Sequence, residues 1–327
     1  MEFRTIVNIA DSTLRIDYHS QLMLLGSCFA QSIGKYLCDN KFNVIVNPFG
    51  ILYNPASIAK VLLRLHNKIH FTQEELFLHD GLCHSFLHHG DFSNPIKEEC
   101  LANINQEYEK AAANLFQTDT LIITFGTAYV FENRKTSEVV ANCHKLPASQ
   151  FSRSRLTVKQ IVTEWTELIR VLRSDNPDLN LLFTVSPIRH WKDGAHENQL
   201  SKATLLLAID EICRNHNNIY YFPSYELMLD DLRDYRFYAE DMIHPNDTAV
   251  KYIWDAFKDT FFDSQTENII KEWQHIKLAV SHRPFNPDTA EHKQFLRQTL
   301  LKLDAFCEKY PYFDCSKEKD ILKDQLL

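Results

Sequence analysis

The sequence feature that most constrains the fold is a series of five short, continuous apolar runs, which span residues 22–25, 42–46, 121–125, 181–185 and 219–222. Glycine, asparagine, serine or proline follows each run, and segments with helical spacing of apolar residues separate the runs. Runs of this length are typical of parallel strands that are buried on both faces of a sheet. We therefore predict an α/β protein with a three-layer, flavodoxin-like fold around a five-stranded parallel sheet.

Two insertions and a C-terminal tail depart from this plan. Segment 70–95 contains an Asp-Gly turn at 80–81 between mixed apolar stretches, which predicts a β-hairpin. Segment 127–150 has two strand-like stretches around a charged turn and predicts a second hairpin. After these, the tail has apolar residues at helical spacing. We expect an α/β domain over residues 1–264 and a helical extension over 265–327, and the pattern leaves open whether the extension packs on the sheet.

The charge balance and the cysteine pattern exclude several classes of protein. The chain of 327 residues has 35 basic and 43 acidic residues, a net charge of −8, and so offers no electrostatic footprint for nucleic acid or an anionic membrane. No apolar run approaches the roughly 18 residues of a membrane span. Residues 1–4 lack the layout of a signal peptide, and the eight cysteines form no CxxC pair. We therefore expect a cytoplasmic protein with reduced thiols.

Glycine is scarce, with seven in 327 residues, well under the average of about 7%. Each glycine is therefore expected where a side chain would interfere. Gly26, Gly50 and Gly126 all fall near the end of an apolar run. Because the carboxyl ends of parallel strands meet at one edge of a sheet, where such sheets bind ligands, we expect the functional site at that edge.

Ser27 is the first candidate for chemistry, because it follows Gly26 where a strand passes into a helix. Its hydroxyl would lie at the edge of the sheet, and the helix N-terminus would offer free N–H groups to an oxyanion. Taken alone, Ser27 is more simply explained as a helix N-cap. Cys28 is a rival nucleophile, because a helix N-terminus lowers the pKa of a thiol. Adjacent helical residues point about 100° apart, so we expect Cys28 to fill the core.

A second candidate is the DxxHP segment formed by Asp241, His244 and Pro245. A histidine just before proline cannot easily continue a helix, so it is expected at the end of an irregular segment that precedes a helix from about Asn246. Asp241 can bend back, accept the imidazole proton and fix the tautomer of His244, as the acid of a Ser-His-Asp set does. The alternative is an ordinary loop histidine that is satisfied by a nearby carboxylate.

Histidines also cluster near the first predicted hairpin, which raises the possibility of a metal-dependent hydrolase. His79, His84, His88 and His89 do not match a metal-ligand spacing such as HExxH, and the surrounding region alternates like a strand. We interpret them as surface or substrate-facing histidines and predict no metal site. The chain also lacks the glycine-rich loops that bind nucleotides, so no cofactor is predicted.

The order of these blocks resembles that of SGNH (GDSL-type) hydrolases: Ser27 after the first strand, Gly50 after the second, Gly126 after the third, and DxxHP before the last helix of the α/β domain. The segment Gly-Ser-Cys-Phe-Ala at 26–30 is similar to the signature of the GSCFA family, a bacterial branch of that superfamily. Further segments are similar to recurring segments of this family, at 47–55, 142–145 and 186–190. The resemblance covers roughly residues 20–260, and the tail resembles the helical end of the family.

This resemblance implies a serine esterase without a cofactor. Ser27 would be the nucleophile, His244 the general base and acid, and Asp241 the residue that orients His244. The backbone N–H groups of Ser27 and Gly50 would hold the oxyanion. The wider superfamily adds an asparagine side chain from a GxND block, whereas this chain has alanine at position 128, and the loss of one oxyanion donor typically costs about 10²–10³ in rate.

Another donor could replace that asparagine, and Thr127 and Asn142 are our candidates. Asn142, His144, Arg189 and His190 could bind the polar part of a substrate, or they could simply satisfy loop hydrogen bonds. The expected partner is a small-molecule or carbohydrate ester. Two other functions remain open: a ligand-binding protein with impaired catalysis, and an acyltransferase that uses the same serine. The sequence does not indicate the oligomeric state.

Overall fold

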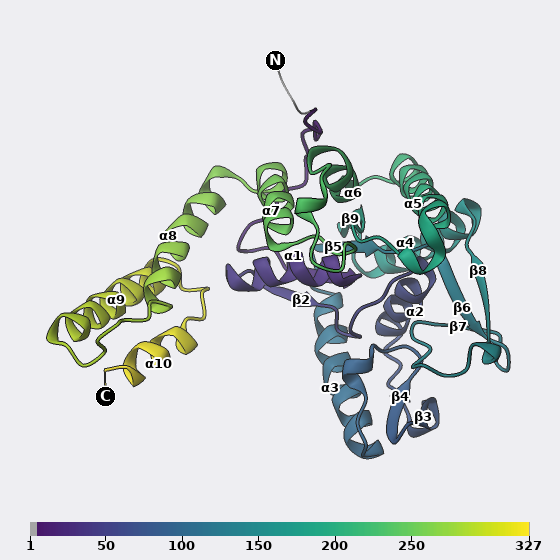
Figure 1. Ribbon diagram of the computed structural model, residues 1–327, viewed down its shortest axis with the longest axis horizontal. Coiled ribbons are helices and arrows are strands. Elements are labelled where there is room, and N and C mark those ends of the chain that lie inside the picture. Colours follow the sequence, from purple (N-terminus) through teal and green to yellow (C-terminus); the bar gives the residue numbers. More distant parts are fainter. Residues whose placement is uncertain (1–4, 327) are drawn as a thin grey trace.

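All five apolar runs form strands of one parallel sheet in the computed structural model, which describes residues 5–326 (Figure 1). Counted along the chain, the strands lie in the order 2-1-3-4-5, the arrangement of a flavodoxin-like, doubly wound sheet. The predicted fold class is therefore confirmed. In spatial order the strands are β10 (Ile219–Phe222), β9 (Asn180–Val185), β5 (Thr120–Phe125), β1 (Leu22–Gly26) and β2 (Val44–Val46).

The strand register aligns the carboxyl ends of the central strands. Gly26 of β1 pairs with Thr124 of β5, and Phe125 of β5 pairs with Val185 of β9. The connection from β1 runs to β2 on one side, and the chain then crosses back to β5 on the other side of β1. The ends of β1 and β5 therefore border a topological switch point, the place where open α/β sheets bind ligands.

Helices cover both faces of the sheet and form its outer layers (Figure 1). Trp165 is fully buried on one face and Trp254 is buried on the other, as expected of core residues. The first face is covered by α2 (Pro55–His66), α3 (Lys97–Leu115), α4 (Val158–Asp175) and α5 (Gly194–Asn215), and the second by α1 (Cys28–Asp39) and α7 (Asp247–Phe261).

Side-chain caps fix where two of these helices begin. Asn54 caps α2, and its Oδ1 accepts the Ser57 N–H at 2.8 Å while Pro55 occupies the first turn. Asn246 caps α7, and its Oδ1 accepts the Ala249 N–H at 3.0 Å. The residue types explain both starts, because a capping side chain satisfies a backbone donor that has no partner within the helix, and proline is tolerated in the first turn.

The two insertions contain the predicted hairpins and one further strand. β3 (Leu76–His79) pairs antiparallel with β4 (Leu82–Ser85) around the Asp-Gly turn. β6 (Tyr129–Asn133) pairs with β7 (Glu138–Val140) and also with β8 (Phe151–Arg155), which extends the second insertion beyond residue 150. The sequence did not indicate β8, because its residues after the first are serine and arginine without apolar alternation.

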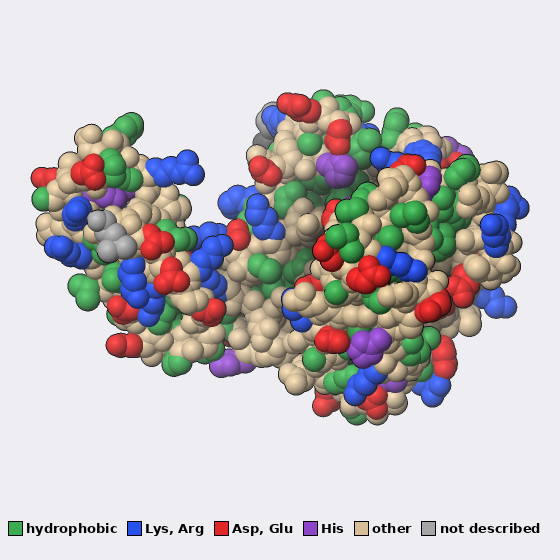
Figure 2. All heavy atoms as spheres, turned by 90° about the horizontal axis from the view of Figure 1, so that it is seen from below, with side chains coloured by type: hydrophobic (Ala, Val, Ile, Leu, Met, Phe, Trp, Pro, Cys, Tyr) green, Lys and Arg blue, Asp and Glu red, His purple; other side chains and the backbone are tan. Residues whose placement is uncertain are grey.

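The C-terminal segment forms three helices, α8 (Ser264–Val280), α9 (Ala290–Lys309) and α10 (Ser316–Asp324). Figure 2 shows them as a lobe beside the larger α/β body. Trp273 of α8 is fully buried, and its indole N–H donates to Asp39 O of α1 at 2.9 Å. Phe313 packs on Tyr18, which stacks on Phe42 at 4.4 Å between ring centroids. The extension thus continues the hydrophobic core on the α1 and α7 face.

Within residues 5–326, no helix is both long enough and apolar enough to cross a bilayer. Residues 1–4, on which the prediction about a signal peptide rests, lie outside the described part of the chain. All eight cysteines are free thiols.

Candidate active site

The turn between β1 and α1 brings Ser27 to the edge of the sheet. Gly26 has a φ of +147°, and a Cβ at this position would lie 2.2 Å from the carbonyl oxygen of Thr124, so only glycine fits. Ser27 caps α1, and its Oγ accepts the Phe29 N–H at 3.2 Å. The serine is therefore an N-cap, as its position indicates, and its hydroxyl also reaches the carboxyl edge of β1.

The DxxHP segment forms a tight turn in which one carboxylate holds the histidine. His244 Nδ1–H donates to Asp241 Oδ2 at 2.5 Å, and Asp241 Oδ1 accepts the N–H groups of Ile243 and His244 at 2.9 Å each. Met242 adopts a φ of +56°, which lets the chain turn back on itself. These hydrogen bonds, chiefly the backbone ones, lower the pKa of Asp241 to about 2. The carboxylate is therefore ionised at neutral pH, and Nδ1 carries the proton while Nε2 is left as the basic nitrogen.

Arg189 holds this turn against the rest of the protein. Its guanidinium donates to Met242 O and packs 4.4 Å from the ring centroid of Tyr238. The backbone N–H of Arg189 also donates to Ile243 O at 3.4 Å. Arg189 was expected to bind substrate, and although it lines the pocket described next, these contacts make it a tether for the loop that carries His244.

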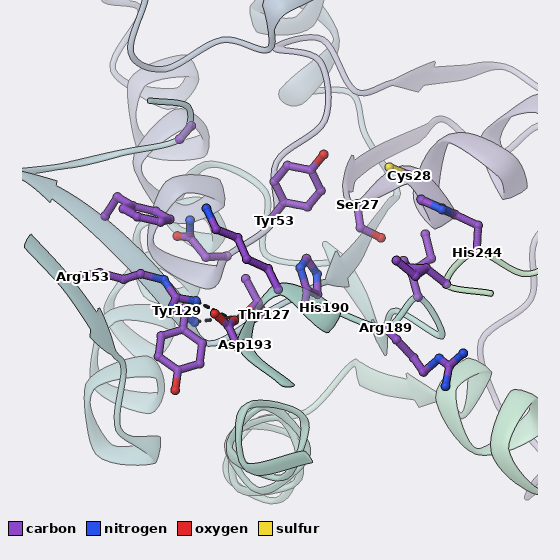
Figure 3. Close-up of a pocket in the computed structure, with 16 residues that line it drawn as sticks. Ser27, Cys28, Tyr53, Thr127, Tyr129, Arg153, Arg189, His190, Asp193 and His244 are labelled. Carbon is purple, nitrogen blue, oxygen red and sulfur yellow. Dashed lines mark hydrogen bonds and ion pairs between the residues drawn. The ribbon is translucent and has the colours of Figure 1, made fainter. Parts of the chain in front are cut away.

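Ser27 and His244 line one pocket of about 320 Å³ at the carboxyl edge of the sheet (Figure 3). Tyr53, Tyr129 and Phe131 supply aromatic surface to its wall. Within residues 5–326, the Ser27 hydroxyl has the N–H of its own helix as its hydrogen-bond partner, so it is not engaged by another side chain. This volume is within the range of small-molecule sites, and the pocket combines a hydroxyl, an imidazole and apolar walls.

The structure separates the expected oxyanion donors. The Ser27 N–H lies at 3.3 Å from Thr124 O, near the upper limit of a hydrogen bond. Gly50 does not line the pocket: its N–H donates to Asn47 O at 2.7 Å, and its Cα faces His89. The cause is Asn47, whose φ of +46° closes a turn and directs Gly50 towards a neighbouring groove.

The side chains of the two proposed replacements for the missing asparagine, Thr127 and Asn142, form hydrogen bonds with other residues. Thr127 lines the pocket, but its Oγ1 bonds Ser201 Oγ at 3.0 Å and accepts the Tyr129 N–H at 3.1 Å. Asn142 does not line the pocket, and its Oδ1 accepts the N–H of His144 at 2.9 Å.

His144 is likewise not brought to the pocket, although it was expected to bind substrate. Its Nε2–H donates to Ser85 O at 2.8 Å, and its ring packs 4.4 Å from that of His84. Burial lowers the pKa of His144 to about 4. This histidine therefore serves the packing between the two insertions.

The interpretation of the hairpin histidines as surface or substrate-facing is wrong for His84 and His88, which are buried. Burial lowers the pKa of His88 to about 3, and its ring packs among phenylalanines such as Phe71, at 4.6 Å between centroids. His84 Nδ1 forms a hydrogen bond with Ser93 Oγ at 2.6 Å and His88 Nδ1 forms one with Ser85 Oγ at 2.9 Å, whereas the buried Nε2 of His88 has no hydrogen-bond partner within the described residues. Within the part of the chain that the structure describes, no group of three or more His, Cys, Asp or Glu is arranged to hold a metal.

Cys28 is half-buried and lines the pocket, so its expected role as a core filler is only partly correct. Burial raises the pKa of its thiol, and a hydrogen bond with Tyr53 only partly offsets this effect. A raised pKa keeps the sulfur protonated, which disfavours Cys28 as a nucleophile.

The sequence model of the GSCFA family matches residues 21–257, and that of the C-terminal domain of GSCFA domain proteins matches 273–327. The chain belongs to the GSCFA family. No curated protein matches this GSCFA chain well enough to count as a relative.

Solved structures with a distant similarity to this GSCFA protein include two esterases. One is an acetyl xylan esterase, Est2A, from the rumen bacterium Butyrivibrio proteoclasticus, with 14% sequence identity, a TM-score of 0.36, and a match over 74% of this chain and 64% of the esterase. This chain thus spans just under two thirds of that protein. The other is a carbohydrate esterase family 3 protein from Talaromyces cellulolyticus, with 9% identity, a TM-score of 0.35, and a match over 77% of this chain and 99% of the other.

The GSCFA pocket also contains residues that the sequence did not single out. Arg153 of β8 forms an ion pair with Asp193 at 2.6 Å across one end of the pocket, drawn as a dashed line in Figure 3. Lys202 of α5 does not line the pocket: it is fully buried, and its ammonium donates to Gly126 O and Ser186 O at 2.7 Å each. Burial lowers the pKa of Lys202 to about 7. The sequence does not mark Lys202 as a buried donor to backbone carbonyl groups, because most lysines in amphipathic helices are exposed to solvent and have the same sequence context.

Proposed function

We propose that this GSCFA protein is a serine-dependent esterase that removes a small O-acyl group, such as acetyl, from a carbohydrate-like or small-metabolite ester. One observation carries the proposal: Ser27, at the N-terminus of α1, and His244, paired with Asp241, line the same pocket. A hydroxyl, a base and an acid that orients the base are the parts that acyl transfer through a serine requires.

In the proposed reaction, Ser27 Oγ attacks the ester carbonyl carbon while its proton passes to His244 Nε2. The resulting oxyanion collapses, the bond to the alcohol oxygen breaks, and that oxygen takes the proton from His244. Water then attacks the acyl-Ser27 ester and gives a proton to His244. The bond between the acyl carbon and Ser27 Oγ breaks, Oγ takes that proton from His244, and the carboxylic acid is released. Asp241 stays ionised throughout and stabilises the imidazolium that forms twice in each cycle.

The N-terminus of α1 also favours the negative charge that forms in this reaction. The N-terminus of this helix of 12 residues carries a partial positive charge next to Ser27. Negative charge that develops on the acyl oxygen would thus be stabilised.

The pocket walls support a polar ester with a small acyl group. Tyr53, Tyr129 and Phe131 offer flat apolar surface, and Arg153, Lys192 and Asp193 offer hydrogen-bonding groups at its edge. Pockets with apolar walls and a few polar groups bind small ligands in a fixed orientation. We therefore place the alcohol part of the ester, sugar or metabolite, against this wall.

One observation favours a second candidate, a ligand-binding protein with impaired catalysis. Ala128 is fully buried and the Thr127 hydroxyl is already bonded, so segment 126–128 contributes no free side-chain donor to an oxyanion. A third possibility, an acyltransferase, would use the same acyl-Ser27 intermediate with an alcohol as acceptor in place of water.

A fluorophosphonate probe followed by peptide mapping tests the proposal directly. The probe should label Ser27 in the wild type and in Ser32→Ala, which removes a serine of α1 five residues further along the chain. Ser27→Ala should lose both labelling and turnover of a nitrophenyl acetate ester, by about 10³-fold or more, while keeping its circular dichroism spectrum. Cys28→Ala should label normally.

Each alternative has its own result in this experiment. Labelling without hydrolysis, together with transfer of the acyl group to an added alcohol, indicates an acyltransferase. An unlabelled wild type, with turnover equal to that of Ser27→Ala, rules out the serine mechanism and leaves the binding protein.

A further inference from the structure

One wall of the pocket contains a histidine that neither the catalytic pair nor the loop tether uses. His190 extends from the loop after β9, lines the pocket, and lies beside Ser27 in Figure 3. A Cβ built on Gly126 would lie 3.2 Å from His190 Nε2 and 3.5 Å from Ser27 Cβ. The imidazole and the serine therefore border one common gap, which exists because residue 126 has no side chain.

We propose that His190 is the side-chain oxyanion donor of this enzyme: its Nε2–H donates a hydrogen bond to the acyl oxygen when Ser27 attacks. This inference rests on the proposed esterase function. It assigns to the loop after β9 the donor that position 128 cannot supply, because alanine has no polar side chain.

The gap has a suitable size for an oxygen atom. A point 3.2 Å from His190 Nε2 is within reach of an N–H···O hydrogen bond. The acyl carbon bonds to Ser27 Oγ, so its oxygen is expected within van der Waals distance of Ser27 Cβ, on the side of this gap. The nearest atom to this point is Tyr53 O, at 3.0 Å, which accepts the N–H groups of Gly126 and Thr127 at 2.8 and 2.9 Å. The acyl oxygen must therefore lie on the His190 side of the gap, away from this carbonyl oxygen.

The protonation state of His190 suits a donor better than a base. Burial is the main cause that lowers its pKa to about 4, and the positive charge of Lys202 adds to the effect. A neutral imidazole keeps one N–H and can polarise a carbonyl without transferring a proton. The general base needs a carboxylate partner, and Asp241 provides it to His244 instead.

The fold also holds His190 in place, as an oxyanion donor requires. Its backbone N–H donates to Asn198 Oδ1 of α5 at 2.9 Å, and its ring meets that of Tyr53 edge to face, at 5.8 Å between centroids. The ammonium of Lys202, from the same helix, donates hydrogen bonds to the carbonyl groups of both Gly126 and Ser186. Helix α5 thus fixes both sides of the gap relative to Ser27.

The test compares His190→Ala, His190→Asn and the control His196→Ala with the wild type on nitrophenyl acetate. His196 is exposed on α5 and lies outside the pocket. His190→Ala should lower kcat by about 10²–10³-fold, the usual effect of losing one oxyanion donor, while KM changes by less than about threefold. His190→Asn restores an N–H donor and should recover about tenfold or more of the loss. His196→Ala should match the wild type.

Two further measurements separate a donor from other roles. The ratio of wild-type to His190→Ala kcat should stay constant between about pH 6 and about pH 9, because a donor does not titrate in that range. The probe should label Ser27 in His190→Ala, but at a rate reduced by a similar factor.

Specific outcomes overturn the inference. A kcat of His190→Ala within threefold of the wild type shows that His190 is not the donor, and a change in KM alone makes it a substrate-binding residue. Loss of the acid limb of the pH profile in His190→Ala makes it the base. In each case a wild type that depends on Ser27 leaves the proposed esterase intact, whereas an inactive, unlabelled wild type overturns both.

Discussion

One carboxylate, that of Asp241, holds His244 at both its ring and its backbone. Oδ2 accepts the Nδ1–H at 2.5 Å, and Oδ1 accepts the His244 N–H at 2.9 Å. The imidazole therefore has one fixed tautomer and one fixed orientation relative to its own loop. Two consequences of this arrangement, and three of other features of the fold, can be measured.

Asp241→Asn should lower kcat by about 10²-fold or more. The asparagine Oδ1 can still accept the backbone N–H groups, so the turn is kept, but an amide no longer stabilises the imidazolium. The control is Asp230→Asn, which removes an exposed carboxylate that pairs with Arg233, and it should be neutral. Esterase assays of both variants give the answer, and equal activities would contradict the orienting role.

The same carboxylate should not contribute to the acid limb of the pH–rate profile. Its pKa is lowered to about 2, so Asp241 stays ionised as the pH falls and is neutralised only near that value. A carboxylate with an ordinary pKa would instead titrate near pH 4. The profile of kcat/KM, measured from about pH 4 to about pH 9, should therefore contain no ionisation that Asp241→Asn removes.

Stability should fall in acid because of the buried histidines His88 and His144. Their pKa values are lowered to about 3 and about 4, so the folded state keeps both rings neutral. The unfolded chain takes up protons on them below about pH 6.5, which favours unfolding. Each histidine should lower the free energy of unfolding by up to about 1.4 kcal/mol per pH unit below pH 6.5, until the pKa of that histidine in the folded state is reached.

Urea unfolding at a series of pH values measures this effect. His88→Leu should reduce the slope of the unfolding free energy against pH by about one proton. His275→Leu is the control, because His275 is exposed on α8, and it should leave the slope unchanged. A slope that is the same in both variants would place the acid sensitivity elsewhere.

Gly126→Ala should impair activity more than stability. The added methyl would lie 3.0 Å from Tyr53 O and 3.2 Å from His190 Nε2, and it would fill the gap beside Ser27. Displacement of these groups by a few tenths of an ångström should lower kcat by about 10–100-fold, with a loss of about 1–3 kcal/mol in unfolding free energy from overpacking. Gly90→Ala, where a Cβ would have open space, should keep full activity.

Trp273→Ala should destabilise the whole protein by about 3–5 kcal/mol. The indole is fully buried and donates to Asp39 O of α1. Leu278→Ala, on the exposed side of the same helix, should change the unfolding free energy by less than about 0.5 kcal/mol. Because one core cluster includes both parts, thermal unfolding should show a single transition, and two separate transitions would contradict the shared core.

The sequence predicted the sheet well because its strands are buried on both faces, which leaves unbroken apolar runs. It did not reveal β8, whose serine and arginine residues look like a loop. The buried positions of His84 and His88 were missed because their rings pack against residues that are distant in sequence, such as Phe49 for His88 and His144 for His84.

The candidate site was predictable only in part. Ser27, Asp241 and His244 are marked by local motifs, and all three sit where those motifs indicate. The closeness of His190 to Ser27 depends on β9 lying next to β5 and β5 next to β1, and strand order is not readable from the runs themselves. Gly50 faces away from the pocket because the left-handed conformation of Asn47 redirects the chain. The sequence alone does not show that Asn47 adopts this conformation.

The way the C-terminal helices pack has a practical consequence for anyone who shortens this protein. A chain cut after Phe262 would remove Phe313 from Tyr18 and Trp273 from α1, and so expose aromatic rings that belong to the interior. We expect the truncated chain to aggregate through this exposed apolar surface, so it would not serve as a minimal catalytic unit.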